Sequence, residues 1–301
     1  MTVFVVALGG GHGLAVTLRA LRGLGIEPVA IVGTGDDGGS SGRLRTHLGV
    51  PPPGDLRMAL ASLAEEGLWT RVLQHRFGGS GDVEGHALGN LILVALWEET
   101  GDLVAGLDRL GLVLGARGRV LPNCLEPVEL VADIEADGGE IVEVRGQARL
   151  TASRGRIVSL RLRPADPRVC PEAVSSVRDA SHVVIGPGSW FTSVLSHILV
   201  PEMAKALKET SAQRILVLNA GPQAGETEGF TAVRHLETWA LLARDIPLDA
   251  IVVDPRSVDD MAGFERTAGS LGARVVTADV LVGTSHHDPD RLTAALGGFI
   301  Q

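Results

Sequence analysis

Residues 3–13 read VFVVALGGGHG, an uninterrupted apolar run that ends in a loop rich in glycine. An apolar run without polar alternation predicts a strand that is covered on both faces, as in a parallel sheet. A helical pattern follows directly over residues 14–24. Strand, glycine loop and helix in this order begin a βαβ unit, so this stretch predicts a doubly wound α/β fold.

The same alternation of strand and helix recurs along the chain. Further short apolar strands are predicted at residues 28–32, 182–185, 215–218, 251–253 and 275–278, and helices at 201–209, 231–241 and 289–296. We therefore predict an α/β protein with a Rossmann-like, doubly wound, mainly parallel sheet. Ligands of such sheets bind beyond the carboxyl ends of the strands, so the loops at those ends are the candidate site.

Two segments depart from this alternation of strands and helices. Residues 55–113 show only helical patterns, at 56–66, 68–75, 90–99 and 103–110, and we expect a helical insertion subdomain there. Residues 127–163 carry β-rich runs at 128–132, 141–150 and 157–162, which predict an antiparallel β-hairpin extension. The nucleotide-binding core is then expected over residues 1–54 and 114–301.

Composition argues against nucleic acid as a partner. The 301 residues hold 27 Lys and Arg against 36 Asp and Glu, a net charge of −9, which opposes non-specific binding to a polyanion. With six Phe, four Trp and no Tyr, an aromatic platform for single-stranded nucleic acid is also not expected.

The apolar segments and the cysteines bear on the compartment. No basic region precedes the first apolar run, as a signal peptide requires, and the longest other run, 91–97, is too short for a bilayer. Cys124 and Cys170 match no metal-ligand spacing and are interpreted as reduced thiols, with a structural disulfide as the alternative. We expect a cytoplasmic protein without membrane insertion.

The first glycine loop is a candidate phosphate site. Its backbone N–H groups can approach a phosphate at the start of the following helix, and the candidates are Gly10, Gly11, His12 and Gly13. The loop is neither a complete GxGxxG pattern nor a P-loop ending in Lys-Ser/Thr. The alternative is a tight turn with a solvated His12.

The second strand ends in the denser loop GTGDDGGSSGR at residues 33–43. Asp36 and Asp37 can bind Mg²⁺, position a ribose or accept hydrogen bonds from a base edge. The phosphate-binding candidates of this loop are Gly39, Ser40, Ser41 and Arg43. The alternative is a solvated, flexible connection.

Later strand ends and helix starts add further polar candidates. These are Asp55 and Arg57 after a proline run, His86 and Asn90 before a helix, Gly186, Pro187, Gly188, Ser189 and Thr192 after strand 182–185, and Asn219, Gln223, Glu226 and Thr227 after strand 215–218. Ser189 is not in a GxSxG elbow, so we do not interpret it as a hydrolase nucleophile. Each loop alone can be a turn or a helix start, but together they predict a large polar cleft for a phosphorylated ligand.

With these stretches assembled, the sequence resembles the gluconeogenesis factor (YvcK) branch of the CofD-like family. The matching stretches are 9–14, 36–45, 52–57, 85–93, 117–122, 186–195 and 225–231, and the block DDGGSSGRLR at 36–45 is specific to this branch. The chain departs from the family pattern at His12, Met58, residues 219–223 and His286, where an Arg is more usual.

The resemblance implies a Rossmann-like core with a helical insertion that binds UDP-sugars. It further implies a cytoplasmic regulator that links carbon metabolism to cell-wall synthesis and cell shape, with a cell-wall-synthesis protein as partner and a homodimer as an added expectation. Relatives in the other branch transfer 2-phospho-L-lactate from a guanosine diphosphate-linked donor to a deazaflavin, with Mg²⁺.

Three functions follow from the residues and the resemblance. The leading one is a UDP-sugar-binding regulator with no catalytic residue, for which the UDP-sugar is the expected ligand and Mg²⁺ a further candidate. The alternative is a CofD-like transferase in which Asp36 and Asp37 hold Mg²⁺ on the diphosphate. The third is a scaffold whose cleft is vestigial, which the many backbone-exposing glycine loops oppose.

Overall fold

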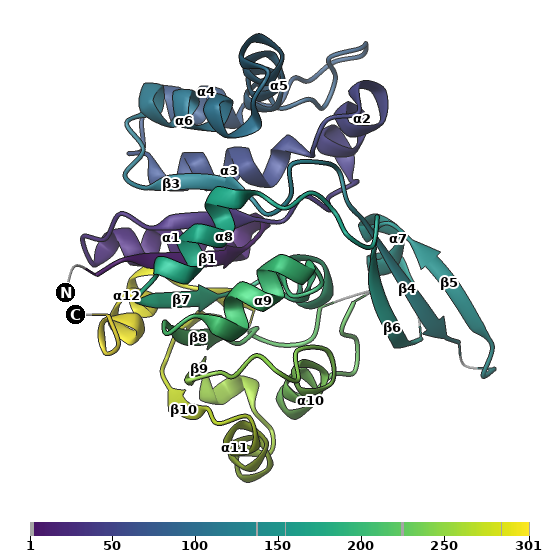
Figure 1. The fold of residues 1–301 in the computed structure, drawn as a ribbon, viewed down its shortest axis with the longest axis vertical. Helices are drawn as coiled ribbons and strands as arrows, with labels where there is room; N and C mark the ends of the chain where they lie inside the picture. Colours follow the sequence, from purple (N-terminus) through teal and green to yellow (C-terminus); the bar gives the residue numbers. More distant parts are fainter. Residues whose placement is uncertain (1–2, 137, 154, 224–225, 284, 301) are drawn as a thin grey trace.

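The protein is built around a seven-stranded parallel sheet (Figure 1). The structure, a computed structural model, describes residues 3–136, 138–153, 155–223, 226–283 and 285–300. The strands follow the order β10-β9-β8-β7-β1-β2-β3. They are β1 (Val5–Gly9), β2 (Val29–Val32), β3 (Arg119–Pro122), β7 (His182–Ile185), β8 (Gln213–Val217), β9 (Ala250–Val253) and β10 (Arg274–Thr277). The predicted doubly wound fold is confirmed, and β3 is a strand that the sequence did not predict.

The direction of winding changes at β1. From β1 the chain runs outward through β2 to β3, and then returns to place β7 on the free side of β1. All pairs in this sheet are parallel, and Val5–Leu8 of β1 lie opposite His182–Ile185 of β7. The carboxyl ends of β1 and β7 therefore border the crevice in which doubly wound sheets bind their ligands.

Alternate residues of the strands face two separate cores. In β1, Val6 and Leu8 belong to one buried cluster, and Val5 and Ala7 belong to the other. One core is closed by α1 (Gly11–Gly23), α3 (Pro53–Leu63) and α12 (Pro289–Gly297). The opposite core is closed by α8 (Pro171–Asp179), α9 (Pro201–Glu209), α10 (Ala232–Leu242) and α11 (Met261–Ser270). Two covered faces explain why the strands carry no polar alternation.

The connection from β2 to β3 is helical. Besides α3 it contains α2 (Gly39–Leu48), α4 (Leu68–Gln74), α5 (Leu88–Thr100) and α6 (Leu103–Leu114), and α4–α6 form the upper helical layer in Figure 1. The four predicted helices of this region are confirmed within a few residues. The prediction of a loop over 33–43 is wrong from Gly39 onward, where α2 begins, because Ser40 and Ser41 are fixed by hydrogen bonds to Asn90 and Gly54.

A small antiparallel sheet of order β5-β4-β6 lies beside the core, at the right of Figure 1. Its strands are β4 (Glu129–Glu135), β5 (Ile141–Arg145) and β6 (Arg156–Arg163), which confirms the predicted extension. The predicted single strand over 141–150 is wrong beyond Arg145. Gly146, with a φ of 88°, turns the chain into α7 (Gln147–Ala152), and the Asp37 carboxylate accepts a hydrogen bond from the Ala148 N–H at 2.8 Å.

In the part of the chain that the structure describes, no helix combines the length and the apolar character required to cross a membrane. Cys124 and Cys170 are buried free thiols, as predicted. Burial raises the pKa of each thiol to about 12, so neither is a reactive thiolate at neutral pH.

Candidate functional site

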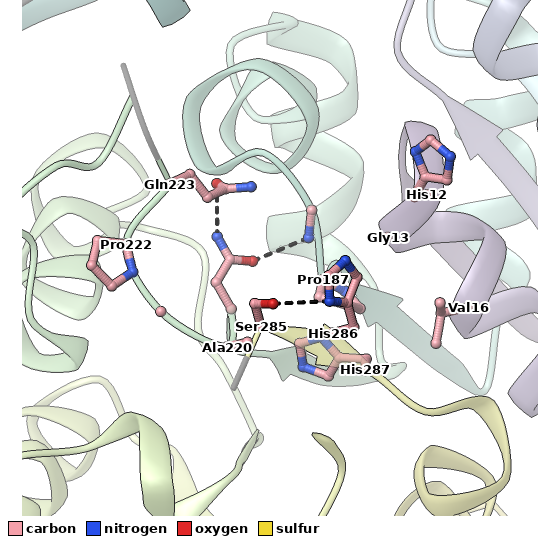
Figure 2. Close-up of a pocket in the computed structure, with 13 residues that line it drawn as sticks. His12, Gly13, Val16, Pro187, Ala220, Pro222, Gln223, Ser285, His286 and His287 are labelled. Atoms are coloured by element: carbon pink, nitrogen blue, oxygen red, sulfur yellow. Dashed lines mark hydrogen bonds between the residues drawn. The ribbon is translucent and has the colours of Figure 1, made fainter. Parts of the chain in front are cut away.

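A pocket of about 380 Å³ opens at the carboxyl ends of β1, β7 and β8, beside the point where the winding reverses (Figure 2). Four segments surround it: the first turns of α1, the loop after β7, the loop after β8, and the hairpin of β11 (Leu281–Val282) and β12 (His286–His287). The lining residues are His12, Gly13, Val16, Pro187, Gly188, Asn219, Ala220, Gly221, Pro222, Gln223, Ser285, His286 and His287.

Glycine at position 13 allows α1 to lie directly against the loop after β7. A Cβ atom there would be 2.2 Å from the Pro187 carbonyl oxygen and 2.7 Å from the Gly188 Cα. The N-cap residue of α1, Gly10, makes no side-chain cap, and the Asp55 carboxylate accepts a hydrogen bond from the Gly11 N–H. The backbone of His12 and Gly13, the next residues of this turn, lies at the edge of the pocket. The glycine loop thus leads into a helix beside the pocket, and its binding of a phosphate stays a prediction.

The side-chain amides of Asn219 and Gln223 join the loops after β7 and β8 (Figure 2). Asn219 Oδ1 accepts a hydrogen bond from the Gly188 N–H at 3.1 Å, and Asn219 Nδ2 donates to Gln223 Oε1 at 3.1 Å. Gln223 Oε1 also accepts from the Trp190 N–H at 3.1 Å. Both side chains line the pocket as predicted, and they also hold its wall in shape.

The hairpin that completes the pocket is fastened by Asp254. This buried carboxylate accepts hydrogen bonds from the Val280 and Leu281 N–H groups at 3.0 and 3.2 Å, and it forms an ion pair with Arg256. The Arg256 guanidinium holds the pKa of Asp254 well below its usual range. Sequence reasoning assigned neither Asp254 nor the hairpin to the site, because two-residue strands carry no periodicity that could reveal them.

A second group of predicted residues gathers at the ends of β1 and β2, outside the pocket lining. The Asp36 carboxylate accepts a hydrogen bond from the Gly38 N–H at 3.0 Å, and Ser41 Oγ accepts from the Gly54 N–H at 3.0 Å. Asp55 lies against the first glycine loop, where a Cβ on Gly10 would be 2.6 Å from its Oδ2. Burial raises the pKa of Asp55 to about 7, with a smaller contribution from the charge of Asp36, and burial also raises the pKa of Asp36.

Arg57 is the buried cation of this second group. Its side chain is only 3% exposed, and its Nε and Nη1 find no hydrogen-bond partner among the described residues. Burial, together with the charge of Arg76, lowers the pKa of Arg57 to about 10. Two unsatisfied nitrogens on a buried guanidinium are costly, and the charge of Asp55 offsets only part of the cost of burial.

Ser40, His86 and Asn90 form a hydrogen-bonded triad between α2 and α5. Ser40 Oγ lies 3.0 Å from His86 Nδ1 and accepts from Asn90 Nδ2 at 2.9 Å. Arg43 donates to the Glu84 carbonyl, so one of its nitrogens already has a partner. These residues stabilise the helical layer around Arg57, and they do not line the pocket.

The two adjacent carboxylates have different partners. Asp36 binds within its own loop, whereas Asp37 accepts from the Ala148 N–H at the start of α7. No group of three His, Cys, Asp or Glu side chains suited to a metal ion occurs among the residues that the structure describes. Within the described residues, Mg²⁺ on Asp36 and Asp37 would therefore need further oxygen ligands from a substrate or from water.

The loop after β7, which supplied candidates for the predicted polar cleft, already holds a carboxylate of the protein. Glu226 accepts hydrogen bonds from the Phe191 and Thr192 N–H groups, each at 2.9 Å, and from the Ser189 hydroxyl. Burial raises the pKa of Glu226. Thr227 Oγ1 accepts from the Gln223 N–H at 2.8 Å, so this network fixes the loop that forms one wall of the pocket.

The structure thus divides the predicted cleft. It brings His12, Gly13, Pro187, Gly188, Asn219 and Gln223 into one pocket. Gly10 and Gly11 border the second group, Gly39 is exposed at the start of α2, and the Gly186 carbonyl accepts from Thr17 Oγ1 at 2.7 Å. Gly225, in one of the stretches that carried the resemblance, lies outside the described residues.

Comparison with known proteins agrees with this architecture. Residues 5–286 match the family model described as 2-phospho-L-lactate transferase CofD. A Mycobacterium tuberculosis protein named "Putative gluconeogenesis factor" is 48% identical over 99% of this chain and 90% of its own length. The Bacillus subtilis gluconeogenesis factor is 38% identical over 92% of this chain and 86% of its own length.

Solved structures point to the same group. The crystal structure of a UPF0052 family member from Bacillus halodurans matches with a TM-score of 0.89 at 35% sequence identity. The match covers 98% of this chain and 99% of the other. The chain accordingly belongs to the CofD/UPF0052 family, as a homologue of the gluconeogenesis factors.

Proposed function

We propose that this protein is a nucleotide-sugar-binding regulator of the gluconeogenesis factor type, with a UDP-sugar bound in the pocket beside β1 and β7. The observation that carries the proposal is the pocket itself, which lies where doubly wound sheets bind nucleotides. Its volume of about 380 Å³ falls within the range of small-ligand sites, roughly 300–1,000 Å³.

The lining suits the parts of a nucleotide sugar. The first turn of α1 offers the amide groups of His12 and Gly13 to a phosphate, and Gly13 and Gly188 allow the backbone to come close. Val16 and Pro222 provide apolar surface for a base or sugar ring, and the amide of Gln223 provides polar recognition. No Asp or Glu is among the described lining residues, so nothing described there repels a diphosphate.

The regulatory part of the proposal rests on the relatives. Curated relatives carry the name gluconeogenesis factor, and the resemblance in sequence supports a cytoplasmic role that connects carbon metabolism with cell-wall synthesis and cell shape. A protein of cell-wall synthesis is the proposed partner, and a homodimer is the proposed assembly.

One observation favours a second function, transfer of a phosphorylated group as the family description implies. Asp55 has its pKa raised to about 7 and lies against the first glycine loop, near Asp36. A carboxyl group with such a pKa can exchange a proton at neutral pH, as a general acid or base must. In that case Mg²⁺ would lie on Asp36 and Asp37 together with the ligand's oxygens.

Thermal unfolding with UDP-sugars tests the proposal. At about 100 times its Kd, a ligand that binds only the folded state adds roughly 2.7 kcal/mol of stability. Val16→Phe fills the pocket and should abolish this stabilisation, whereas the same change at the exposed Val113 on α6 should preserve it. Mass spectrometry should find the nucleotide sugar intact, with or without Mg²⁺.

Two results would contradict the proposal that the protein is a UDP-sugar-binding regulator. If UDP-sugars leave the melting temperature unchanged while other nucleotides raise it, the assignment of the nucleotide is wrong. If Mg²⁺ causes release of a nucleoside monophosphate from the donor, the protein is a transferase.

A further inference from the structure

The ionisable side chains among the described lining residues of the pocket are histidines. Of the described residues that line the pocket, none is Asp, Glu, Lys or Arg, and the ionisable side chains are His12, His286 and His287. A diphosphate carries negative charge that a binding site normally balances with Arg, Lys or a metal ion. Among the described lining residues, histidine is the residue type whose side chain can carry a positive charge.

His287 has a structural role in the hairpin. Its Nε2 donates a hydrogen bond to the Leu218 carbonyl at 3.1 Å, which joins the hairpin to the end of β8. Burial lowers the pKa of His287, and the nearby charge of Asp254 offsets only part of this effect. The lowered pKa favours the neutral ring, and its hydrogen bond to Leu218 fixes the hairpin that carries His286.

His12 and His286 are exposed and reach the pocket from different elements (Figure 2). His12 extends from the first turn of α1. His286 extends from β12, and its Nδ1 lies 2.9 Å from Ser285 Oγ, which orients the ring and leaves Nε2 for a ligand. Both rings therefore line the same pocket, one from α1 and the other from the hairpin.

Most of the charged groups on the surrounding elements have partners within the protein. On the hairpin side, Arg256 and Arg291 both pair with Asp279, and Asp288 accepts from the first N–H groups of α12. Beneath the glycine loop lies Asp55, Glu226 is held by the turn after β7, and Arg19 is exposed further along α1. None of these charged groups is among the described residues that line the pocket.

We propose that His12 and His286 bind the phosphates of the ligand as imidazolium groups, so that binding takes up protons and the affinity rises as the pH falls. The ligand class is a phosphorylated one, and to that extent the inference rests on the proposed function. Histidine changes its charge between pH 5 and 8, and its charged form makes the stronger hydrogen bond to phosphate. An Arg at position 286 would bind phosphate without any such dependence on pH.

Calorimetric titration with UDP-glucose at several pH values between 5.5 and 8.5 tests this inference. Both phosphates of UDP-glucose are diesters and keep the same charge across this range, so a change in affinity reports on the protein. We expect the Kd to tighten by about tenfold or more between pH 8 and pH 6, since each histidine can contribute up to about tenfold per pH unit. The binding enthalpy should vary with the ionisation enthalpy of the buffer, because protons are taken up.

Variants separate the histidines from other causes. His286→Arg should bind tightly at every pH with a flattened profile, and His286→Gln should bind weakly at every pH. His12→Gln should reduce the number of protons taken up. His47→Gln, at an exposed histidine of α2 outside the pocket, should keep the wild-type profile. Uridine, which lacks phosphates, should bind without dependence on pH.

The possible outcomes distinguish the inference from the proposed function. A wild-type Kd for UDP-glucose that is constant across the pH range overturns the inference and leaves the proposed function intact. An unaltered pH profile in His286→Arg overturns the role of His286. Absence of UDP-glucose binding in both the wild type and His286→Arg at every pH overturns the proposed function itself.

Discussion

Replacing Asp55 by Asn removes an ionisable group that the fold holds in an unfavourable place. Burial raises the pKa of Asp55 from its ordinary value of 3.8 to about 7, and the charge of Asp36 adds to the effect. The raised pKa means that the folded state disfavours the carboxylate relative to the unfolded chain. The wild type therefore loses stability wherever the unfolded chain ionises and the folded protein does not.

The magnitude follows from the pKa. Below about pH 4 the Asp55 carboxyl group is protonated in both the folded and the unfolded state. The wild type and Asp55→Asn should then have nearly equal unfolding free energies. Between about pH 4 and pH 7 each pH unit lowers the stability of the wild type by about 1.4 kcal/mol, and the loss levels off above pH 7 at about 4 kcal/mol. The introduced amide keeps an oxygen that can accept from the Gly11 N–H, so Asp55→Asn should be more stable at pH 8 by up to this amount.

Urea unfolding at pH 4.5, 6 and 8, followed by tryptophan fluorescence, measures the difference. The gain in unfolding free energy for Asp55→Asn should grow with pH, whereas Asp82→Asn, in an exposed loop of the helical layer, should show no such trend. A gain that is the same at pH 4.5 and pH 8, or a variant less stable than the wild type at pH 8, would refute the reasoning. A carboxyl group kept at such a cost is typical of a functional position.

Three further substitutions test the contacts around the site. Gly13→Ala should lower the unfolding free energy, measured with urea, by more than about 2 kcal/mol, because its Cβ would meet a carbonyl oxygen at 2.2 Å. Gly269→Ala, in open space on α11, should be neutral or stabilising by up to about 1 kcal/mol in the same assay. Asp254→Asn should lower the unfolding free energy by about 2–3 kcal/mol at pH 7. The loss should shrink progressively below pH 4, because a carboxylate with a lowered pKa stabilises the fold less as the pH falls. Asp279→Asn should lower the unfolding free energy by about 1 kcal/mol or less. Arg57→Met should leave the melting temperature unchanged or raise it, because the buried guanidinium lacks hydrogen-bond partners on two of its nitrogens. A fall in stability of about 3 kcal/mol would contradict this and reveal a partner for that charge.

The sequence contained enough information to predict most of the sheet. Continuous apolar runs such as the one at β8 identify strands that are covered on both faces, and six of the seven parallel strands were found this way. The missed strand, β3, has only four residues and includes an Arg and a Pro. Its place in the sheet comes from pairing with β2, which no local pattern encodes.

The helix α2 was missed for a related reason. Its sequence begins with Gly-Ser-Ser-Gly, which has low helix propensity and is typical of a loop. Tertiary contacts compensate, since Ser41 Oγ accepts from the Gly54 N–H and Ser40 Oγ accepts from Asn90. Helices α8 and α11 were likewise not predicted, although their apolar positions pack against the sheet.

The candidate site was predictable only as a set of loops. Gly13, Gly188 and Asn219 were recognised because each follows a strand, and the topology does bring them together. Which loops form one pocket depends on the strand order, which separates Asp55 and Arg57 from the lining. The role of Asp254 depends on two backbone N–H groups far along the chain, and only the folded structure reveals it.

The position of β1 inside the sheet, with a neighbour on each side, has a consequence for synthesis. Its partner on one side, β2, leaves the ribosome soon after it, but its partner on the other side, β7, begins only at His182. At about five to twenty residues per second, that interval lasts on the order of ten to thirty seconds. During this time the nascent chain has an open, apolar strand edge, which is the type of surface that pairs with other chains. We therefore expect newly made chains to be most prone to aggregation before residue 185 has emerged, and a chaperone that covers this edge to raise the yield of folded protein.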